Sequence, residues 1–468
     1  MLCDILSICA LASAAAATTG DHSSRGQKAD VVKRDVCIIG GGSSGTYSAV
    51  RLQQMNKTVA VVERNNRLGG HVNTYVNPAT NQTFDYGVIF WKNTTVVTDY
   101  FAYLDVPLAR SPLVSPAIPA YADFANASRV SADALATGNL TAGFEAYLAQ
   151  LAKYPYLTTG FDLPDPVPED LLLPFGDFVR KYDLGAIAFT ISLYNQGMGN
   201  ILAQPTLYVL KYFPASTAIS AFTDSFVTTA RHNNQELYDK ALEKLGSSVF
   251  LDSNVIRIKR YHDCVEVLTS TPTGPQIIHA SALLVTVPPE LASVGFLDTD
   301  GVEQSLLGQF NSSYYWDTIL EGSGIPDNVS LTNIDPQAPY GVPAMPGIYI
   351  FGYVGMPGLH TVYYSSPHPL SDAAVKADIL AQAAALVQSL GYKPPVNGSP
   401  TFVGLNAHNP FELTVSTEAI RKGFYGRFGG LQGRRRTWWT GAAWQAQDSS
   451  AIWDFTERVV LPQLVAAC

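Results

Sequence analysis

The sequence is poor in charged residues and in clustered basic ones. Only 15% of its 468 residues are Asp, Glu, Lys or Arg, the formal net charge is -9, and the longest basic run is Arg434-Arg435-Arg436. A nucleic-acid partner is not expected, because such binding needs a basic patch or stripe. Hydrophobic residues make up 47% of the chain and aromatic residues 11%, which is ample for large cores and excludes a mainly disordered protein.

Long apolar runs and metal-binding clusters are also missing. No stretch reaches the roughly 18 apolar residues of a membrane span, so we expect no stable membrane anchor. The five cysteines contain no CxxC motif, and the eight histidines form neither His-x-His nor His-Glu-x-x-His. A metal site is therefore not expected, and the sequence leaves the oligomeric state open.

The N-terminus resembles a secretory signal peptide. A short apolar stretch from Ile5 to Leu11 precedes four alanines, although the residues before it include Asp4 and neither Lys nor Arg. We interpret residues 1–17 as a signal peptide and residues 18–34 as a candidate pro-segment ending at the dibasic pair Lys33-Arg34. The chain also contains N-glycosylation sequons at Asn56, Asn81, Asn93, Asn126, Asn139, Asn311, Asn328 and Asn397. We therefore expect a secreted glycoprotein.

A strand, a glycine-rich turn and a helix begin the folded part of the chain. Val36 to Ile39 is an apolar run typical of a buried parallel strand, and Gly40-x-Gly42-x-x-Gly45 follows it directly. In a dinucleotide fingerprint these glycines allow the tight turn, the approach of the pyrophosphate and the packing of helix on strand. Glu63 ends the next predicted strand, about 20 residues on, where an acidic residue binds ribose hydroxyls. The pattern predicts a dinucleotide-binding domain.

The same turn permits a second interpretation. Gly41-x-Ser43-x-Gly45 also matches the nucleophile elbow of serine hydrolases. That elbow needs acid and histidine partners later in the chain, and the last histidine, His408, has no distinctive sequence around it. A serine hydrolase stays open as the less favoured alternative.

Strand and helix patterns divide the chain into alternating segments. The dinucleotide-binding domain is predicted to comprise residues 35–91, 228–305 and 402–468, and a substrate domain to comprise the mostly helical residues 92–227 together with residues 306–401. We expect a hairpin between Val72 and Gly87, a strand meander between Ser248 and Val287, and a long helix from Ser371 to Leu390.

The residues after Glu63 distinguish FAD from NAD. Arg64 is followed by Gly69-Gly70-His71 and then by Phe84-Asp85-Tyr86-Gly87, and here the sequence resembles the flavin-containing amine oxidase superfamily. With Asp85-Tyr86-Gly87-Val88 and Thr440-Gly441-Ala442-Ala443-Trp444, it is most similar to the fungal β-cyclopiazonate dehydrogenase-like flavoproteins. The resemblance implies an α/β fold, in which a doubly wound Rossmann-type FAD-binding domain carries an inserted α+β substrate domain. The cofactor-binding residues that it implies are Gly40, Gly42, Ser44, Gly45, Glu63, Arg64, Gly69, Gly70, His71, Val255, Gly441 and Ala442, with Val255 against the adenine.

Two departures from the amine oxidases bear on the chemistry. His71 stands where their pattern usually has arginine, and their lysine near flavin N5 has no counterpart between Lys259 and Lys376. Ordinary amine oxidation becomes an alternative rather than the main expectation. No cysteine lies between Gly423 and Gly433, where some amine oxidases attach the flavin, so we expect noncovalent FAD.

The expected function is FAD-dependent dehydrogenation of a small organic substrate by hydride transfer to flavin N5, as in specialised-metabolite biosynthesis. Molecular oxygen is the expected acceptor, because no soluble electron carrier is guaranteed outside the cell. A redox-neutral FAD-dependent isomerase is the other flavoprotein alternative. No residue stands out as a catalytic base, and the candidates are His71, Tyr353, Trp316 and Trp444.

Overall fold

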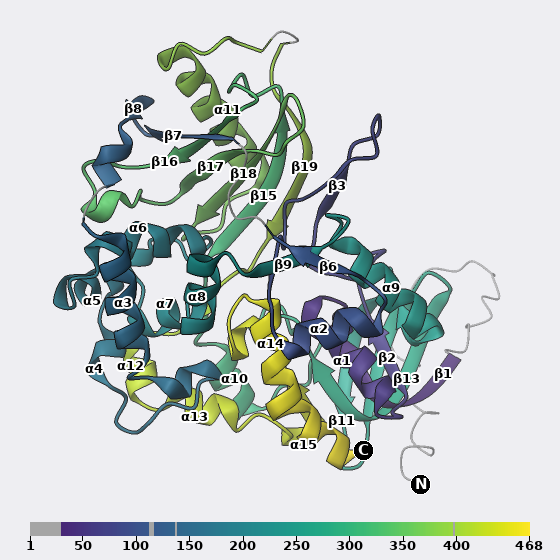
Figure 1. The fold of residues 1–468 in the computed structure, drawn as a ribbon. Helices are drawn as coiled ribbons and strands as arrows, with labels where there is room; N and C mark the ends of the chain where they lie inside the picture. The colour runs from purple at the N-terminus through teal and green to yellow at the C-terminus, as the bar shows by residue number, and fades with distance from the viewer. Residues whose placement is uncertain (1–29, 112–116, 136–137, 396–397) are drawn as a thin grey trace, which may run out of the picture.

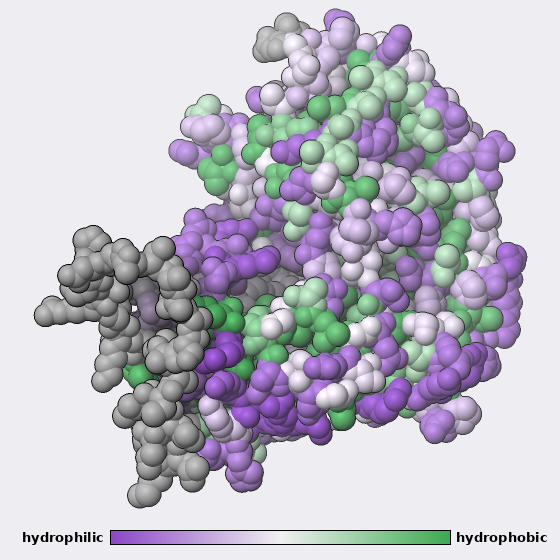
Figure 2. Space-filling model, turned by 180° about the vertical axis from the view of Figure 1, so that it is seen from behind, coloured by the Kyte–Doolittle hydropathy of each residue, from purple (hydrophilic) through white to green (hydrophobic). Residues whose placement is uncertain are grey.

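The computed structural model describes residues 30–111, 117–135, 138–395 and 398–468. The proposed signal peptide, residues 18–29 of the candidate pro-segment and the sequon at Asn397 lie outside the described residues. No helix among the described residues is long and apolar enough to cross a membrane. On the face opposite to that of Figure 1, hydrophobic residues occur in small groups among hydrophilic ones (Figure 2).

The first sheet gathers seven strands from three distant stretches of the chain (Figure 1). Its order is β10-β2-β1-β13-β12-β11, with β21 beside β13; β10, β2, β1, β13 and β21 pair in parallel, and β12 and β11 add an antiparallel edge. This arrangement confirms the predicted doubly wound α/β domain and the strand meander. The strands are β1 (Asp30–Ile39), β2 (Val59–Val62), β10 (Val249–Phe250), β11 (Asn254–Arg260), β12 (Val265–Thr271), β13 (Gly274–Val285) and β21 (Thr437–Trp439).

The first strand corrects one boundary of the sequence analysis. β1 begins at Asp30, and Lys33 and Arg34 pair with His279 and Ala280 of β13. The dibasic pair is therefore part of the sheet, and the candidate pro-segment cannot extend to residue 34 without removing strand. The four apolar residues from which the strand was predicted, Val36 to Ile39, are at most 3% exposed.

Helices cover this sheet because each has an apolar face. α1 follows β1 after the glycine turn and buries Tyr47, Val50 and Leu52. It contacts α9, α14 and α15, so residues near the C-terminus pack against the first helix. The helices on this side of the molecule are α1 (Ser43–Gln54), α2 (Thr95–Tyr103), α9 (Gln235–Leu245), α14 (Ser449–Phe455) and α15 (Leu461–Ala467). α13 (Phe424–Gly429) contacts α10 (Gly301–Leu307) and α12 (Thr417–Arg421).

A second seven-stranded sheet occupies the upper part of Figure 1, with the long helix α11 packed on it. α11 (Asp372–Ser389) confirms the predicted helix. The sheet order is β19-β15-β18-β17-β16-β7-β8. Its strands are β7 (Ile118–Asp123), β8 (Ser128–Val130), β15 (Tyr314–Glu321), β16 (Val329–Asn333), β17 (Gly347–Tyr353), β18 (Leu359–Ser366) and β19 (Thr401–His408).

Two segments therefore belong elsewhere than predicted. β19 pairs antiparallel with β15, so residues 402–408 are part of the second sheet and not of the third nucleotide-binding segment. β7 and β8 come from the stretch expected to be mostly helical, and β7 pairs in parallel with β16. β19 and β7 could not be placed from their local patterns, because their partners β15 and β16 are far away in sequence, and β8 is held only by its pairing with β7.

A helical layer lies between the two sheets on the left of Figure 1. Its buried residues join the same apolar cluster as the first sheet, so this region has no separate core. A three-stranded sheet, β5-β9-β6, a small pairing of β14 with β20, and the predicted hairpin β3–β4 complete the fold. These elements are α3 (Leu140–Leu151), α4 (Glu169–Leu172), α5 (Phe175–Lys181), α6 (Gly185–Tyr194), α7 (Thr206–Tyr212), α8 (Ala215–Thr223), β3 (Thr74–Val76), β4 (Thr83–Asp85), β5 (Trp91–Lys92), β6 (Leu108–Arg110), β9 (Phe226–Thr229), β14 (Asn311–Ser312) and β20 (Leu413–Thr414).

Candidate active site

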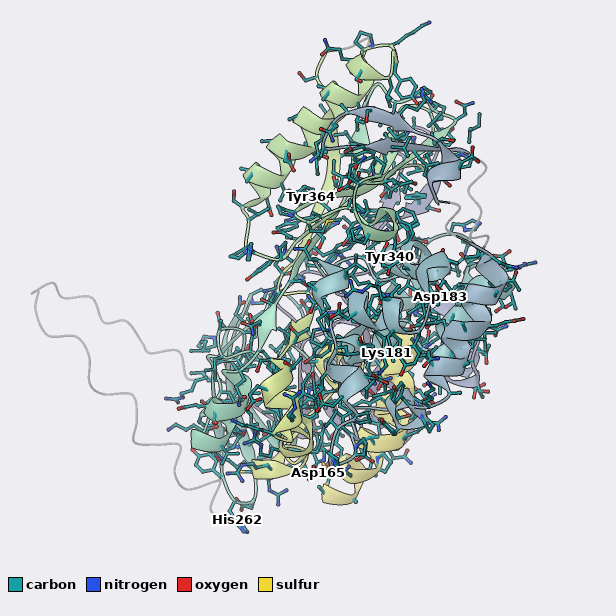
Figure 3. All side chains as sticks on the ribbon, turned by 90° about the vertical axis from the view of Figure 1, so that its left-hand side faces the viewer. Asp165, Lys181, Asp183, His262, Tyr340 and Tyr364 are labelled. Carbon is teal, nitrogen blue, oxygen red and sulfur yellow. The ribbon has the colours of Figure 1, made fainter. Side chains whose placement is uncertain are left out.

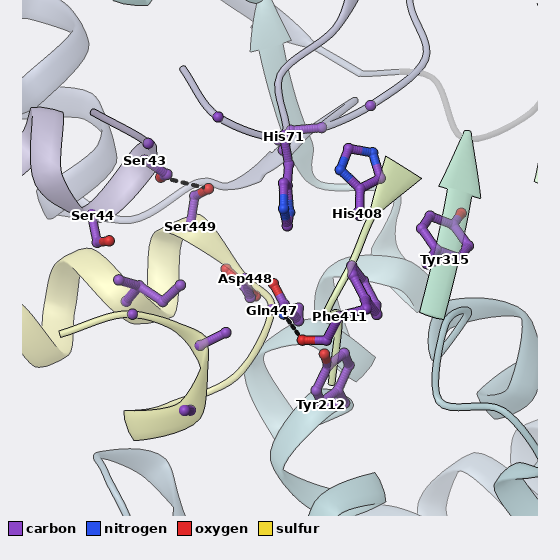
Figure 4. A pocket seen from close by; sticks show the side chains of 18 of the residues that line it. Ser43, Ser44, His71, Tyr212, Tyr315, His408, Phe411, Gln447, Asp448 and Ser449 are labelled. Carbon is purple, nitrogen blue, oxygen red and sulfur yellow. Dashed lines mark hydrogen bonds between the residues drawn. The ribbon is translucent and has the colours of Figure 1, made fainter. Parts of the chain in front are cut away.

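A cavity of about 450 Å³ runs from the glycine turn after β1 to the ends of β15, β18 and β19 (Figure 4). Ligands of doubly wound sheets bind at the carboxyl ends of the parallel strands, and the cavity lies there. Of the expected cofactor-binding residues, those that line it are Gly42, Ser44, Gly69, Gly70, His71, Gly441 and Ala442. The expected residues that do not line it are Gly40, Gly45, Glu63, Arg64 and Val255.

The glycine turn has the shape that a diphosphate requires. Gly40 has φ +100°, and a Cβ on Gly45 would lie 2.0 Å from the Gly40 carbonyl oxygen, so both residues shape the turn from behind. A Cβ on Gly42 would meet only the Gly70 Cα, at 3.8 Å, which leaves the backbone open to the cavity. No side chain caps the N-terminus of α1, so its amide groups and its helix dipole are available to an anion.

Glu63 stands at the end of β2, as predicted. Its carboxylate is 6% exposed and accepts the N–H groups of Gly41, at 2.6 Å, and of Asn65, at 2.8 Å. Its backbone carbonyl accepts the N–H of Ser253, two residues before Val255. Glu63 thus connects the glycine turn to the segment where the adenine was expected, whereas the neighbouring Arg64 is exposed.

The second flavin motif comes from the far end of the chain. Gly441 follows β21 with φ +126°, and a Cβ there would lie 3.6 Å from the Thr286 carbonyl oxygen and 3.8 Å from Ser44 Oγ. The motif therefore lies against the start of α1 and the end of β13. The backbone at Gly42 and Gly441 thus borders the cavity closely, and the shape of this cradle agrees with the cofactor that the sequence implies.

Beyond the cradle the cavity widens into an aromatic chamber. His71 and Trp444, two of the four catalytic candidates, line it, and Trp444 stacks on Phe428 with ring centroids 3.8 Å apart. The other aromatic residues of the chamber are Phe90, Trp91, Tyr194, Tyr212, Phe226, Tyr315, Tyr363 and Phe411.

The structure does not bring the other two catalytic candidates to the cavity. Trp316 is fully buried in the apolar cluster under α11, where its Nε1 donates to Asp372 at 2.9 Å. Tyr353 ends β17 beside His360, with ring centroids 6.0 Å apart, and does not line the cavity. Alternation along a strand decides which face a side chain takes, and one sequence does not show which face meets the site.

A polar network that sequence analysis missed lies at the wall of the chamber. Asp317, 1% exposed on β15, lies 2.6 Å from His408 Nε2 on β19 through its Oδ2. Its Oδ1 accepts Asn406 Nδ2 at 2.9 Å, and Asn73 Nδ2 approaches the carboxylate at 3.4 Å. The antiparallel pairing of β15 with β19 brings these residues together, and no local motif could have revealed it.

His71 and His408 lie side by side at the cavity (Figure 4), and their ring centroids are 4.1 Å apart. The His71 side chain is open to the cavity and otherwise enclosed by protein. Enclosure, together with the nearby His408 and Arg64, lowers the pKa of His71 well below its ordinary value of 6.5. The lowered pKa favours the neutral imidazole of His71.

A second buried acid lies behind the chamber. Tyr212 Oη donates to Glu412 Oε2 at 2.5 Å, and burial raises the pKa of Glu412 to about 8. Lys211 donates to the carbonyl oxygens of Leu157 and Gly160 at 2.9 and 2.6 Å. Burial lowers the pKa of Lys211 to about 7. These groups face the core behind Tyr212, so they support the chamber wall.

The surroundings of Ser43 do not support a serine hydrolase. Its hydroxyl donates to Ser449 Oγ at 2.8 Å and accepts the indole N–H of Trp453 at 3.0 Å. Neither partner can take its proton as a general base.

The nucleotide cradle and the adjoining aromatic chamber define a flavoprotein of the amine oxidase architecture. The protein-family model described as an NAD(P)-binding Rossmann-like domain matches residues 38–104. The fatty acid isomerase from P. acnes, described as producing CLA, superposes with a TM-score of 0.72 at 18% identity, covering 92% of this chain and 99% of that one. Putrescine oxidase gives a TM-score of 0.65 at 17% identity, covering 93% and 100%. At these identities the likeness concerns the fold alone.

Similarity to curated proteins extends over nearly the whole chain. The FAD-dependent oxidoreductase oblC of Cochliobolus heterostrophus is 40% identical, with 98% of each chain covered. The β-cyclopiazonate dehydrogenase of Aspergillus oryzae is 34% identical, over 92% of this chain and 93% of that protein. The chain belongs to this family of FAD-dependent oxidoreductases: it is an enzyme, and its cofactor is FAD. The predicted family, fold class and cofactor are confirmed.

Proposed function

We propose that this enzyme dehydrogenates a small organic molecule by hydride transfer to flavin N5, with noncovalently bound FAD. The observation that carries the proposal is one continuous cavity, with Gly42, Gly70 and Gly441 at one end and the aromatic chamber at the other. Bound FAD supplies a two-electron oxidation. The glycine turn and the start of α1 bind its diphosphate, and Glu63 the ribose hydroxyls.

The chamber favours a flat, largely apolar substrate without negative charge. Rings of Tyr212, Tyr315 and Phe411 offer stacking surfaces and exclude water. Among the described lining residues, Lys92 is the one Lys or Arg, and its Nζ lies 3.1 Å from an Asp448 carboxylate oxygen. An anionic substrate would therefore lack a free cation to pair with.

The substrate is proposed to be a specialised metabolite. The basis is the name of one relative, β-cyclopiazonate dehydrogenase of Aspergillus oryzae, which is similar over nearly its whole length. Among the described residues that line the cavity none is a cysteine, which favours a noncovalent flavin. Secretion, with molecular oxygen as the electron acceptor, is part of the same proposal.

The test is anaerobic reduction of the purified protein by candidate substrates, read from the visible flavin band. A dehydrogenase bleaches with its substrate, and oxygen restores the band with peroxide formed. Acid precipitation should leave the flavin in the supernatant. Substrate conversion with neither net flavin reduction nor oxygen uptake would indicate the isomerase instead, and flavin that stays with the pellet would contradict noncovalent binding.

A matched pair of variants tests the cradle. Gly42→Asp puts a carboxylate where the diphosphate should bind, in space that a Cβ can occupy, and should abolish FAD retention in a folded protein. Gly301→Asp makes the same change at the start of α10, where a Cβ meets nothing within 4 Å, and should retain FAD. Full FAD content in Gly42→Asp would show that the cofactor binds elsewhere.

A further inference from the structure

The Asp317–His408 pair has a defined proton arrangement. The carboxylate accepts from His408 Nε2, so the proton of a neutral His408 ring is on Nε2 and Nδ1 carries the lone pair. Asn406 and Asn73 hold the carboxylate from two other directions. The acid is thereby fixed in orientation, and His408, which lines the cavity, presents a proton-accepting atom beside the chamber.

The two histidines cannot both be charged. Their ring centroids are 4.1 Å apart, and two imidazolium ions at that distance repel each other strongly in an enclosed site. A proton on His408 is compensated by the carboxylate of Asp317. A proton on His71 has no carboxylate at hydrogen-bond distance among the described residues and is opposed by Arg64.

The other titratable groups near the pair are the phenols of Tyr315, Tyr363 and Tyr86 and the guanidinium of Arg67, which donates to Asn73 Oδ1 at 2.8 Å. Tyr315 lies with its ring centroid 6.1 Å from that of His408 and 6.2 Å from that of Tyr363. Burial raises the pKa of both tyrosines far above neutral pH. The charge balance of the site therefore depends on Asp317, the two histidines, Arg64 and Arg67.

We propose that His408 is the general base of the reaction and Asp317 its positioning residue, with His71 as a neutral ring that confines the proton to His408. The inference rests on the proposed dehydrogenase function. It assigns a role to a histidine that sequence analysis had set aside.

The step balances as the oxidation of an H–C–X–H unit, with X nitrogen, oxygen or carbon. The X–H bond breaks, its electron pair becomes the new C–X π bond, and its proton bonds to His408 Nδ1. The C–H hydrogen leaves as hydride with its electron pair, and FAD is the two-electron oxidant. The resulting imidazolium keeps its Nε2–H on Asp317 and later returns its proton to water.

Two variants test the base and its partner. His408→Gln should lower kcat by about 100-fold or more while FAD content stays unchanged. Asp317→Asn should lower kcat/KM at its plateau and change the shape of the kcat/KM–pH profile, because the imidazolium that forms on His408 loses the charge of its partner. His262→Gln, on an exposed loop at the end of the molecule away from Tyr364 (Figure 3), is the control and should match the parent enzyme.

A second measurement does not depend on turnover. Imidazole resonances of the FAD-loaded protein without substrate, assigned with His408→Gln and His71→Gln, should show His408 taking up a proton as pH falls while His71 stays neutral. In His408→Gln, His71 should take up a proton at higher pH than in the parent, because the repelling charge is gone.

The two proposals fail differently. A parent enzyme that no substrate reduces would contradict the dehydrogenase function, and the resonances would still test the pair. Normal kcat and pH profile in both His408→Gln and Asp317→Asn, with an active parent, would exclude His408 as the base. If His71 took up a proton at a higher pH than His408, the proposal that the proton goes to His408 would be wrong.

Discussion

At the scale of single residues, the buried Glu412 makes the stability of this protein depend on pH. Burial raises the pKa of Glu412 to about 8 from its ordinary 4.5, so the folded state keeps a proton that the unfolded chain releases. The contribution of Glu412 to the free energy of unfolding is fully present below pH 4.5. It is lost as the pH rises towards 8, by about 1.4 kcal/mol per pH unit between these values. Lys211, with its pKa lowered to about 7, acts in the opposite sense at higher pH.

Glu412→Gln should remove this dependence. The free energy of unfolding of the parent, relative to the variant, should fall between about pH 5 and about pH 7 by roughly 2 kcal/mol, since only the parent carries the acid. Urea unfolding at several pH values measures the difference. Glu418→Gln, an exposed carboxyl of α12, is the matched control and should give a difference that is flat over the same range. The same flat difference for Glu412→Gln would mean that Glu412 is ionised throughout.

At the scale of elements, α11 depends on both its cap and its buried face. Ser371 Oγ accepts the N–H of Ala374 at 3.2 Å, which satisfies one free amide at the start of the helix. Val375, Ile379 and Ala383 recur at helical spacing and pack in the cluster that contains Trp316. The helix is therefore stabilised both by its N-terminal cap and by its packing on the second sheet.

Ser371→Ala should lower the free energy of unfolding by about 1 kcal/mol, because the amide of Ala374 loses its partner. Denaturant unfolding measures the loss. Ser389→Ala changes an exposed serine in the last turn of the same helix and should cost nothing, since alanine favours helix. Equal effects of the two changes would show that the cap does not stabilise α11.

At the scale of the whole molecule, the proposed secretion agrees with the surface positions of the sequons. The seven sequon asparagines among the described residues are all exposed; they are Asn56, Asn81, Asn93, Asn126, Asn139, Asn311 and Asn328. A glycosyltransferase needs such access. Sequons buried in a core could not carry a glycan in the folded protein.

Protein made by a eukaryotic secretory host should therefore carry N-glycans. Digestion with an N-glycosidase should lower its mass and convert the modified asparagines to aspartates, which peptide mass spectrometry locates. Protein from a bacterial cytoplasm is the unmodified reference. Unmodified asparagines in protein recovered from the medium would contradict the glycoprotein proposal, and protein found only inside the cells would contradict secretion.

The sequence by itself determined the nucleotide-binding half of this enzyme. Gly40 and Gly45 must be glycine for local reasons, a turn with positive φ at Gly40 and a contact at Gly45 that no Cβ tolerates, whereas Gly42 leaves the backbone open to the diphosphate. Such requirements act within a few residues, so a short sequence motif reveals them. The resemblance of Gly69-Gly70-His71 and of Thr440-Gly441-Ala442 to flavoprotein motifs then identified the nucleotide as FAD.

Only the tertiary structure showed which residues surround the proposed substrate chamber. Asp317 and His408 are 91 residues apart, and antiparallel pairing of β15 with β19 brings them to hydrogen-bond distance. The same pairing moved residues 402–408 into the second sheet, and the face that Trp316 takes on β15 placed it in the core. Strand partners and strand faces are chosen by the burial of distant apolar surfaces, and no local pattern records that choice.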